Sequence, residues 1–113
     1  MDVGLKMSEI PENMYYTMKA IISWANDRNI IQGSTPRSQL VKLDEELGEV
    51  MEAVDEDNLQ HIIEEIGDMI VVLTILCEMY DITLPQCAEV AYKKIKNRKG
   101  KMIDGIFVKE EDL

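Results

Sequence analysis

Two pairs of carboxylates, each spaced for one face of a helix, constrain this chain more than any other feature. Glu46 and Glu49 form the first pair and, after fifteen intervening residues, Glu65 and Asp68 form the second. Side chains three positions apart on a helix lie about 5–6 Å from each other at Cβ. Both pairs lie inside otherwise apolar segments, where like charges repel unless a cation lies between them. The spacing therefore predicts two neighbouring helices that hold a cation.

The type of cation follows from the type of ligand. Four carboxylates supply hard oxygen atoms, which suit Mg²⁺ or Mn²⁺, whereas Zn²⁺ usually recruits His or Cys. A glycine, Gly48 or Gly67, stands directly before the second acid of each pair, although glycine costs about 0.5–1 kcal/mol in a helix. This indicates a close approach of backbones or ligands. A single such pair more often only solvates an exposed helix face, but two pairs favour a metal site and hence phosphate chemistry.

The spacing of apolar residues predicts an all-α fold, a four-helix bundle with a short irregular C-terminal tail. The expected helices cover about residues 11–28, 36–55, 59–80 and 84–97. Thr35 and Thr83 are the expected N-caps of the second and fourth helices, each followed by a proline in the first turn. Residues 29–34 are expected to be a connector, and the tail, residues 98–113, a loop with a short extended piece at 106–108.

The distribution of apolar side chains indicates an oligomer. The expected core face of the second helix consists of Leu40, Leu43, Leu47, Val50, Met51 and Val54. The second half of the third helix is apolar on nearly every side, and such a helix is buried on more than one side. The 113 residues make up one domain, residues 1–113, which is small for that purpose. We therefore expect a partner subunit to complete the bundle, as a homodimer or homotetramer.

Charge and composition limit the other partners. With 12 basic and 22 acidic residues the net charge is −10, which argues against a nucleic-acid-binding surface. The longest apolar run, residues 69–77, is far shorter than a membrane span, and no leader opens the chain. Cys77 and Cys87 form no C-x-x-C motif and are expected to be reduced thiols. These features predict a cytoplasmic protein that binds neither nucleic acid nor membrane.

The acidic segments resemble the MazG-like family of all-α nucleoside triphosphate pyrophosphohydrolases. That family carries E-E-x-x-E followed, within a few dozen residues, by E-x-x-D. This chain reads Glu45-Glu46-Leu47-Gly48-Glu49 and Glu65-Ile66-Gly67-Asp68, without departure. Looser similarity to small, single-domain members extends over residues 24–31, 34–36 with Gln39 and Lys42, 91–101 and 105–109.

The resemblance implies hydrolysis of a nucleoside or deoxynucleoside triphosphate between its α- and β-phosphates, giving the monophosphate and pyrophosphate. By motif position it implies that Glu46, Glu49, Glu65 and Asp68 are ligands of Mg²⁺, with Mn²⁺ as a substitute. Such ions would neutralise phosphate charge and lower the pKa of a bound water. Glu45 is the carboxylate left over, and it either orients or deprotonates the water or supports another ligand.

Two residues near the acids are candidate substrate contacts. Lys42 lies one turn before Glu46 and could reach a phosphate oxygen, or it could form an i, i+4 ion pair with Glu46. Trp24 could stack on a base, although a tryptophan on an amphipathic helix is more often part of the core. His61 lies one turn before Glu65, and we expect it to be a polar residue at the helix start, since Mg²⁺ does not favour imidazole.

Three further candidates lie near the end of the fourth helix. The resemblance places Lys94, Asn97 and Arg98 where related enzymes contact phosphate. The alternative is an ordinary basic C-terminal turn, which the helix dipole favours without any ligand.

Two other functions compete with the hydrolase. A carboxylate-bridged di-iron bundle would need E-x-x-H motifs on paired helices, and the single histidine, His61, does not follow an acid by three positions. A non-catalytic acidic helical module that binds a protein partner would need the acids to be exposed, and it would release no pyrophosphate.

Overall fold

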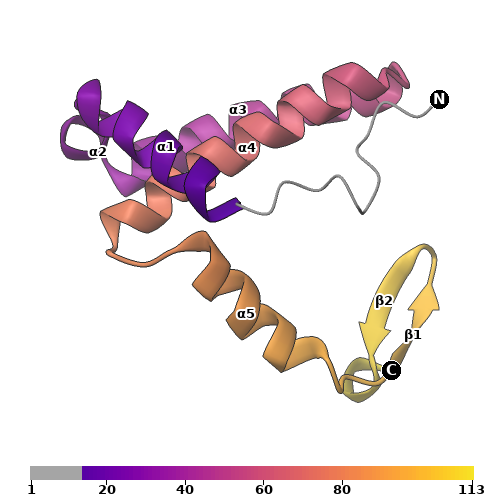
Figure 1. Cartoon of the computed structure of the whole chain (residues 1–113). Coiled ribbons are helices and arrows are strands. Elements are labelled where there is room, and N and C mark those ends of the chain that lie inside the picture. Colours follow the sequence, from indigo (N-terminus) through magenta and orange to yellow (C-terminus); the bar gives the residue numbers. More distant parts are fainter. Residues whose placement is uncertain (1–13) are drawn as a thin grey trace. The chain divides into compact units, whose positions relative to one another are not determined.

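The computed structural model describes residues 14–113, which divide into two compact units. The first unit ends at Ile82 and the second comprises Thr83–Leu113 (Figure 1). The prediction of one domain over residues 1–113 stays a prediction. No helix in the described part of the chain is both long and apolar enough to cross a membrane.

The first unit confirms the all-α class. It contains α1 (Met14–Asp27), α2 (Ile30–Gly33), α3 (Pro36–Asp55) and α4 (Leu59–Met79). The expected start of the first helix, near residue 11, lies outside the described residues. The connector expected at residues 29–34 is wrong in part, because it contains the four-residue helix α2. Asn29 precedes α2 with a left-handed φ of 58°, a conformation that asparagine adopts more readily than most residues.

Local capping sets where α3 and α4 begin. The hydroxyl of Thr35 accepts a hydrogen bond from the backbone N–H of Ser38 at 3.1 Å, as the sequence predicted. The side-chain oxygen of Asn58 accepts one from the N–H of His61, also at 3.1 Å. Only three residues separate the end of α3 at Asp55 from the start of α4 at Leu59, so the helices lie antiparallel and side by side (Figure 1).

The face of α3 that is buried is not the one expected from hydrophobicity. Gln39, Glu46 and Ala53, seven residues apart, are buried. The next line along the helix, about 100° further round, is apolar and open: Leu40, Leu47 and Val54 are 51%, 45% and 55% exposed. The expected core face of the second helix is thus wrong in part for the first unit of the chain: Leu43 and Val50 are half-buried, but the other four residues are exposed and a partly polar line is buried instead.

The second half of α4 is covered within the first unit. Val72, Ile75 and Cys77 are buried, and both α1 and α2 contact α4. Exposed apolar side chains of α4 lie in its first half instead, at Ile63 (42%) and Ile66 (46%). The partner subunit that the sequence predicted for the second half stays a prediction, because Val71, Leu73 and Leu76 are only half-buried there.

The second unit contains a helix and a hairpin. Helix α5 (Leu84–Ile95) starts with a capping box between Thr83 and Gln86, as the sequence predicted at Thr83, and it ends two residues before the expected Asn97. The tail is not irregular, because strands β1 (Gly100–Ile103) and β2 (Ile106–Lys109) pair antiparallel and are followed by the short helix η2 (Glu110–Asp112). The extended piece expected at residues 106–108 is confirmed, since it lies in β2.

The hairpin has a local cause. Asp104 and Gly105 form its turn with φ values of 50° and 82°, and Asp-Gly is a favoured sequence for a two-residue turn with both φ angles positive. A side chain at Gly100 would collide with the backbone carbonyl of Val108 on the opposite strand. Gly105 thus allows the chain to turn, and Gly100 allows the two strands to approach each other.

Candidate metal centre

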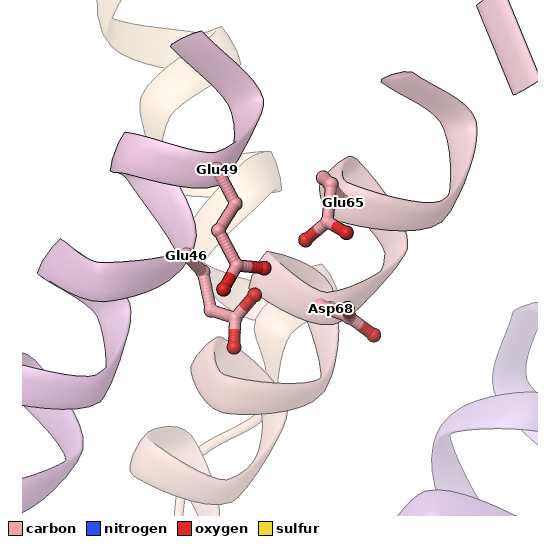
Figure 2. Close-up of side chains that lie close together, drawn as sticks. All are labelled: Glu46, Glu49, Glu65 and Asp68. Carbon is pink, nitrogen blue, oxygen red and sulfur yellow. The ribbon is translucent and has the colours of Figure 1, made fainter. Parts of the chain in front are cut away.

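The four carboxylates predicted from their spacing come together between α3 and α4. Glu46 and Glu49 project from α3 and Glu65 projects from α4 toward one another, while the carboxylate of Asp68, also on α4, lies to one side of them (Figure 2). One carboxylate oxygen from each residue lies within 4.8 Å of the others. The short turn between the antiparallel helices places the pairs opposite each other, and the i, i+3 spacing keeps both members of each pair on the facing side.

The members of each pair differ in burial. Glu46 and Glu65 are buried, at 6% and 8% exposure, whereas Glu49 and Asp68 are exposed. The Oε2 atoms of Glu46 and Glu65 are completely buried and have no hydrogen-bond partner. A buried polar atom without a partner is costly, so nearly all such atoms in native proteins are satisfied. Two unsatisfied oxygens in one cluster indicate a ligand that supplies positive charge.

The other oxygen of each buried glutamate is held by a neighbour on its own helix. The Nζ of Lys42 lies 3.3 Å from Oε1 of Glu46, and Nε2 of His61 lies 3.2 Å from Oε1 of Glu65. Both donors stand four residues before the glutamate, one turn earlier on the same helix face. Each buried carboxylate is therefore bonded on one side and open on the other.

The crowding of the cluster raises the pKa of one member, Glu65. The adjacent side chain of Glu49, followed by burial and by the charges of Glu49 and Asp68, raises the pKa of Glu65 to about 7, against a partial opposing effect from His61. Ionised carboxylates this close repel one another, so Glu65 holds a proton more readily than a free glutamate does. A cation between the carboxylates would relieve the repulsion in place of that proton.

The donor set fits a hard divalent cation. Mg²⁺ binds oxygen at about 2.0–2.1 Å, so opposite ligands of an octahedral ion are about 4.2 Å apart. The span of 4.8 Å between the four oxygens needs only a small contraction to reach that value. No histidine or cysteine belongs to the cluster in the described part of the chain, which disfavours Zn²⁺. Mg²⁺ or Mn²⁺ is the better match.

Glu45 and Lys42 lie beside the cluster. The carboxylate of Glu45 is 61% exposed and lies 3.5 Å from Nζ of Lys42, outside the group of four. Lys42 thus contacts both Glu45 and Glu46, which is the ion pair that the sequence offered as the alternative to a phosphate contact. The hydrogen bond to Glu46 and the charge of Glu46 raise the pKa of Lys42.

Trp24 lies in a pocket next to the acids. The indole is 45% exposed, and the guanidinium of Arg28 lies 4.7 Å from the centre of its ring. The pocket has a volume of about 430 Å³ and lies between α1 and α4. It is lined by Thr17, Ala20, Ile21, Trp24, Asp68 and Val71. An aromatic, mostly apolar hollow therefore shares one wall with the metal cluster.

Lys94, Asn97 and Arg98 come together in the second unit. They line a pocket of about 570 Å³ at the end of α5, with Lys99 and with Glu110 and Glu111 from η2. The pocket thus combines basic and acidic side chains, and its three predicted residues belong to one local site.

His61 is the residue whose place in the site the sequence did not indicate. It was expected to be only a polar residue at the helix start, yet its ring lies between Glu65 and Glu56, with Nδ1 3.5 Å from Oε2 of Glu56. The available signal was a repeated spacing: His61 stands four residues before Glu65, as Lys42 stands four before Glu46.

Comparisons with known proteins agree with the geometry of the acids. A family model described as the MazG nucleotide pyrophosphohydrolase domain matches residues 34–103, which include all four. An uncharacterized 18.2 kDa protein from the rep-hol intergenic region of Haemophilus phage HP1 is 43% identical over 61 residues. Those residues make up 54% of this chain and 37% of that protein, so the match spans little more than a third of the relative. No solved structure matches the chain significantly.

Proposed function

This chain belongs to the family of MazG nucleotide pyrophosphohydrolase domains, and from that premise we propose that it hydrolyses a nucleoside or deoxynucleoside triphosphate with Mg²⁺. The cleaved bond is the one between the α- and β-phosphates, and the products are the nucleoside monophosphate and pyrophosphate. One observation carries the proposal: four carboxylates converge, and two of them present a buried oxygen that has no partner.

The proposed roles of the four acids differ with their burial. When bound, the metal neutralises phosphate charge and makes a bound water easier to deprotonate. Glu46 and Glu65 would hold the ion from the buried side of the gap, through oxygens that solvent does not reach. Glu49 and Asp68 are exposed, so they would hold it from the side that is open to solvent and to a triphosphate. Glu45, exposed and next to Glu46, either orients or deprotonates the attacking water or supports a ligand.

The remaining candidates serve the substrate. We assign the nucleoside to the pocket between α1 and α4, where Trp24 offers an aromatic face and Asp68 connects the pocket to the metal centre. Because the lining is mostly apolar, we expect the base to be bound by stacking and by its shape, and not selected through specific hydrogen bonds. Lys94, Asn97 and Arg98 supply donors and positive charge for phosphate oxygens, grouped in one pocket.

The partner is a second copy of the chain, in a homodimer or homotetramer. In the first unit, apolar side chains remain exposed along α3 and the first half of α4: Leu40, Leu47, Met51, Val54, Ile63 and Ile66. Leaving several such side chains in water is costly, and a two-fold axis lets one apolar face cover its own copy. We expect light scattering at micromolar concentration to give a mass of two or four chains, and a single-chain mass with full activity would contradict this assembly.

The products test the proposed reaction. A panel of nucleoside and deoxynucleoside triphosphates is incubated with the protein and Mg²⁺, and the products are separated by anion exchange. We expect monophosphate and pyrophosphate in equal amounts, and no turnover after chelation. Stepwise release of orthophosphate would contradict cleavage between the α- and β-phosphates, and no turnover of any nucleotide would favour the non-catalytic module.

A matched pair of variants ties the reaction to the cluster. Glu49→Gln removes one of the four carboxylates, whereas Glu64→Gln removes an exposed acid of α4 that lies outside the cluster and accepts a hydrogen bond from Gln60 at 3.3 Å. We expect the first to lose activity and the second to keep it. Equal activity in both variants would remove Glu49 from the proposed ligands.

A further inference from the structure

The two buried glutamates of the metal centre are held in the same way. In both, a donor four residues earlier bonds Oε1, at 3.3 Å from Lys42 to Glu46 and at 3.2 Å from His61 to Glu65. In both, Oε2 is buried and has no partner. A free carboxylate can rotate about its last bond and present either oxygen, but a carboxylate bonded at one oxygen has a fixed orientation. The same arrangement on two helices is therefore a means of aiming the open oxygens.

We infer that His61 and Lys42 are positioning residues of the metal centre. Each holds one oxygen of a buried glutamate so that the second oxygen faces the cation. The inference rests on the proposed function, because it requires that the four carboxylates bind the metal. In this role neither residue touches the ion. Partners that orient metal ligands in this way typically contribute about 10–100-fold in metal affinity.

His61 is the better-placed of the two. Both of its ring nitrogens face a carboxylate, with Nε2 3.2 Å from Oε1 of Glu65 and Nδ1 3.5 Å from Oε2 of Glu56, and its side chain is 32% exposed. The Lys42 side chain is 54% exposed and divides its contacts between two glutamates. Solvent screens an exposed ion pair, and a flexible lysine loses entropy when it is held. We therefore expect His61 to contribute more to metal affinity than Lys42.

A purely electrostatic explanation gives the opposite sign. If the two donors only offset negative charge in the cluster, removing them leaves the cluster at least as attractive to a divalent cation, so the metal binds equally well or more tightly. If they position the carboxylates, removing them weakens metal binding although the site is no less negative. The direction of the change in affinity therefore decides between the explanations.

The chain supplies a conservative replacement and a matched control. Gln60, next to His61, donates from Nε2 to Oε1 of Glu64 at 3.3 Å over the same i, i+4 spacing. A glutamine at position 61 can accordingly reach Glu65, so His61→Gln keeps a donor without the imidazole. Gln60→Leu removes the neighbouring bond, which does not involve the cluster, and it controls for the general effect of placing leucine in the first turns of α4.

The experiment measures Mn²⁺ binding to the metal-free full chain by electron paramagnetic resonance, with Mg²⁺ calorimetry in parallel and no nucleotide present. We expect His61→Leu to weaken binding by about 10-fold or more, His61→Gln to recover most of that loss, Lys42→Met to weaken it less, and Gln60→Leu to match wild type. If His61→Leu fails to fold, His61→Asn takes its place, because its shorter side chain does not reach Glu65.

The outcomes separate this inference from the proposed function. Wild-type protein that binds neither Mn²⁺ nor Mg²⁺ would overturn both. Wild-type binding together with a His61→Leu variant that binds as tightly or more tightly would overturn the positioning role alone, and the proposed metal centre would stand. A loss that His61→Gln does not recover would also overturn it, because a hydrogen-bond donor would then not be what matters.

Discussion

The buried and exposed members of the acid pairs differ in what fixes them. Glu46 and Glu65 are packed between α3 and α4 with one oxygen already bonded, so folding sets their orientation before any cation arrives. Glu49 and Asp68 are exposed on the same gap, where a side chain can still adjust to a ligand. The i, i+3 spacing thus gives each helix one rigid acid and one adaptable acid. The difference indicates that folding orients the two buried acids in advance, at a cost in stability, whereas the two exposed acids can still adjust to an incoming ligand.

The largest expected effect is the loss of activity when either kind of acid becomes an amide. We expect Glu65→Gln and Glu49→Gln each to reduce pyrophosphate release by at least about 100-fold, since losing a residue that only supports a ligand already costs about 10–100-fold. Their metal-free stabilities should differ. Glu65→Gln removes a buried, repelled charge and should raise the thermal midpoint more than Glu49→Gln, whose charge is solvated.

Calorimetric unfolding in the presence of a chelator measures this difference. The pH is about 8, which is above the raised pKa of Glu65, so that its carboxyl group is mostly ionised. Equal gains in midpoint for the two variants would show that burial does not distinguish the two kinds of acid. A variant that keeps near-full turnover would contradict the ligand role of that residue.

An intermediate effect concerns pH. The pKa of Glu65 is raised from 4.5 to about 7, so the folded metal-free protein retains a proton that the unfolded chain has released. This contribution to stability is fully present below pH 4.5 and is lost as the pH rises through about 7. Mg²⁺ takes the place of the proton, so added Mg²⁺ should stabilise the protein more above pH 7 than below it.

Thermal midpoints between about pH 5 and pH 9, with Mg²⁺ and with chelator, measure this dependence. At a concentration of 100 times the dissociation constant, the expected gain from Mg²⁺ is about 2.7 kcal/mol. Glu65→Gln is the control, because its metal-free stability should lack the decline that Glu65 contributes. The same gain from Mg²⁺ at every pH would mean that metal and proton do not compete at Glu65.

The smallest effect is expected at Glu45, an acid next to the centre but outside it. Its side chain is 61% exposed, so Glu45→Gln should change the metal-free free energy of unfolding by less than about 0.5 kcal/mol. It should also leave Mn²⁺ affinity unchanged. A stability gain as large as that of Glu65→Gln would show that closeness to the other carboxylates, and not burial, determines how much an acid destabilises the metal-free protein. The turnover of the same variant decides the role of Glu45. If turnover falls while metal affinity is unchanged, Glu45 orients or deprotonates the attacking water.

Local signals explain what the sequence predicted well. Thr35 and Thr83 act as N-caps through hydrogen bonds to residues three positions on, which need no tertiary information. The acid pairs were found for a similar reason, since helical spacing and a short turn are enough to bring α3 and α4 carboxylates together. The family model that matches residues 34–103 confirms the resemblance drawn from the same acids.

The wrong predictions concern tertiary contacts, that is, which side chains pack against a given residue. Hydrophobicity indicates that Leu40 and Leu47 form an apolar line, but it does not reveal that Gln39 and Glu46 are the residues packed within the chain. Asp104 and Gly105 do indicate a turn, but the hairpin around them was missed because strands of four residues carry little periodicity. The contact of His61 with Glu65 was missed because it depends on a side-chain rotamer, which the sequence does not specify.

The pocket beside the metal centre gives this protein a built-in optical probe. Trp24 is the sole tryptophan of the chain, it is half exposed, and it shares the pocket with Asp68. Indole fluorescence responds to the polarity and contacts around the ring, and here it arises from one place. A ligand that fills the pocket changes that emission without any attached dye. Loading and release of a nucleotide can accordingly be timed by stopped flow, separately from the cleavage that follows.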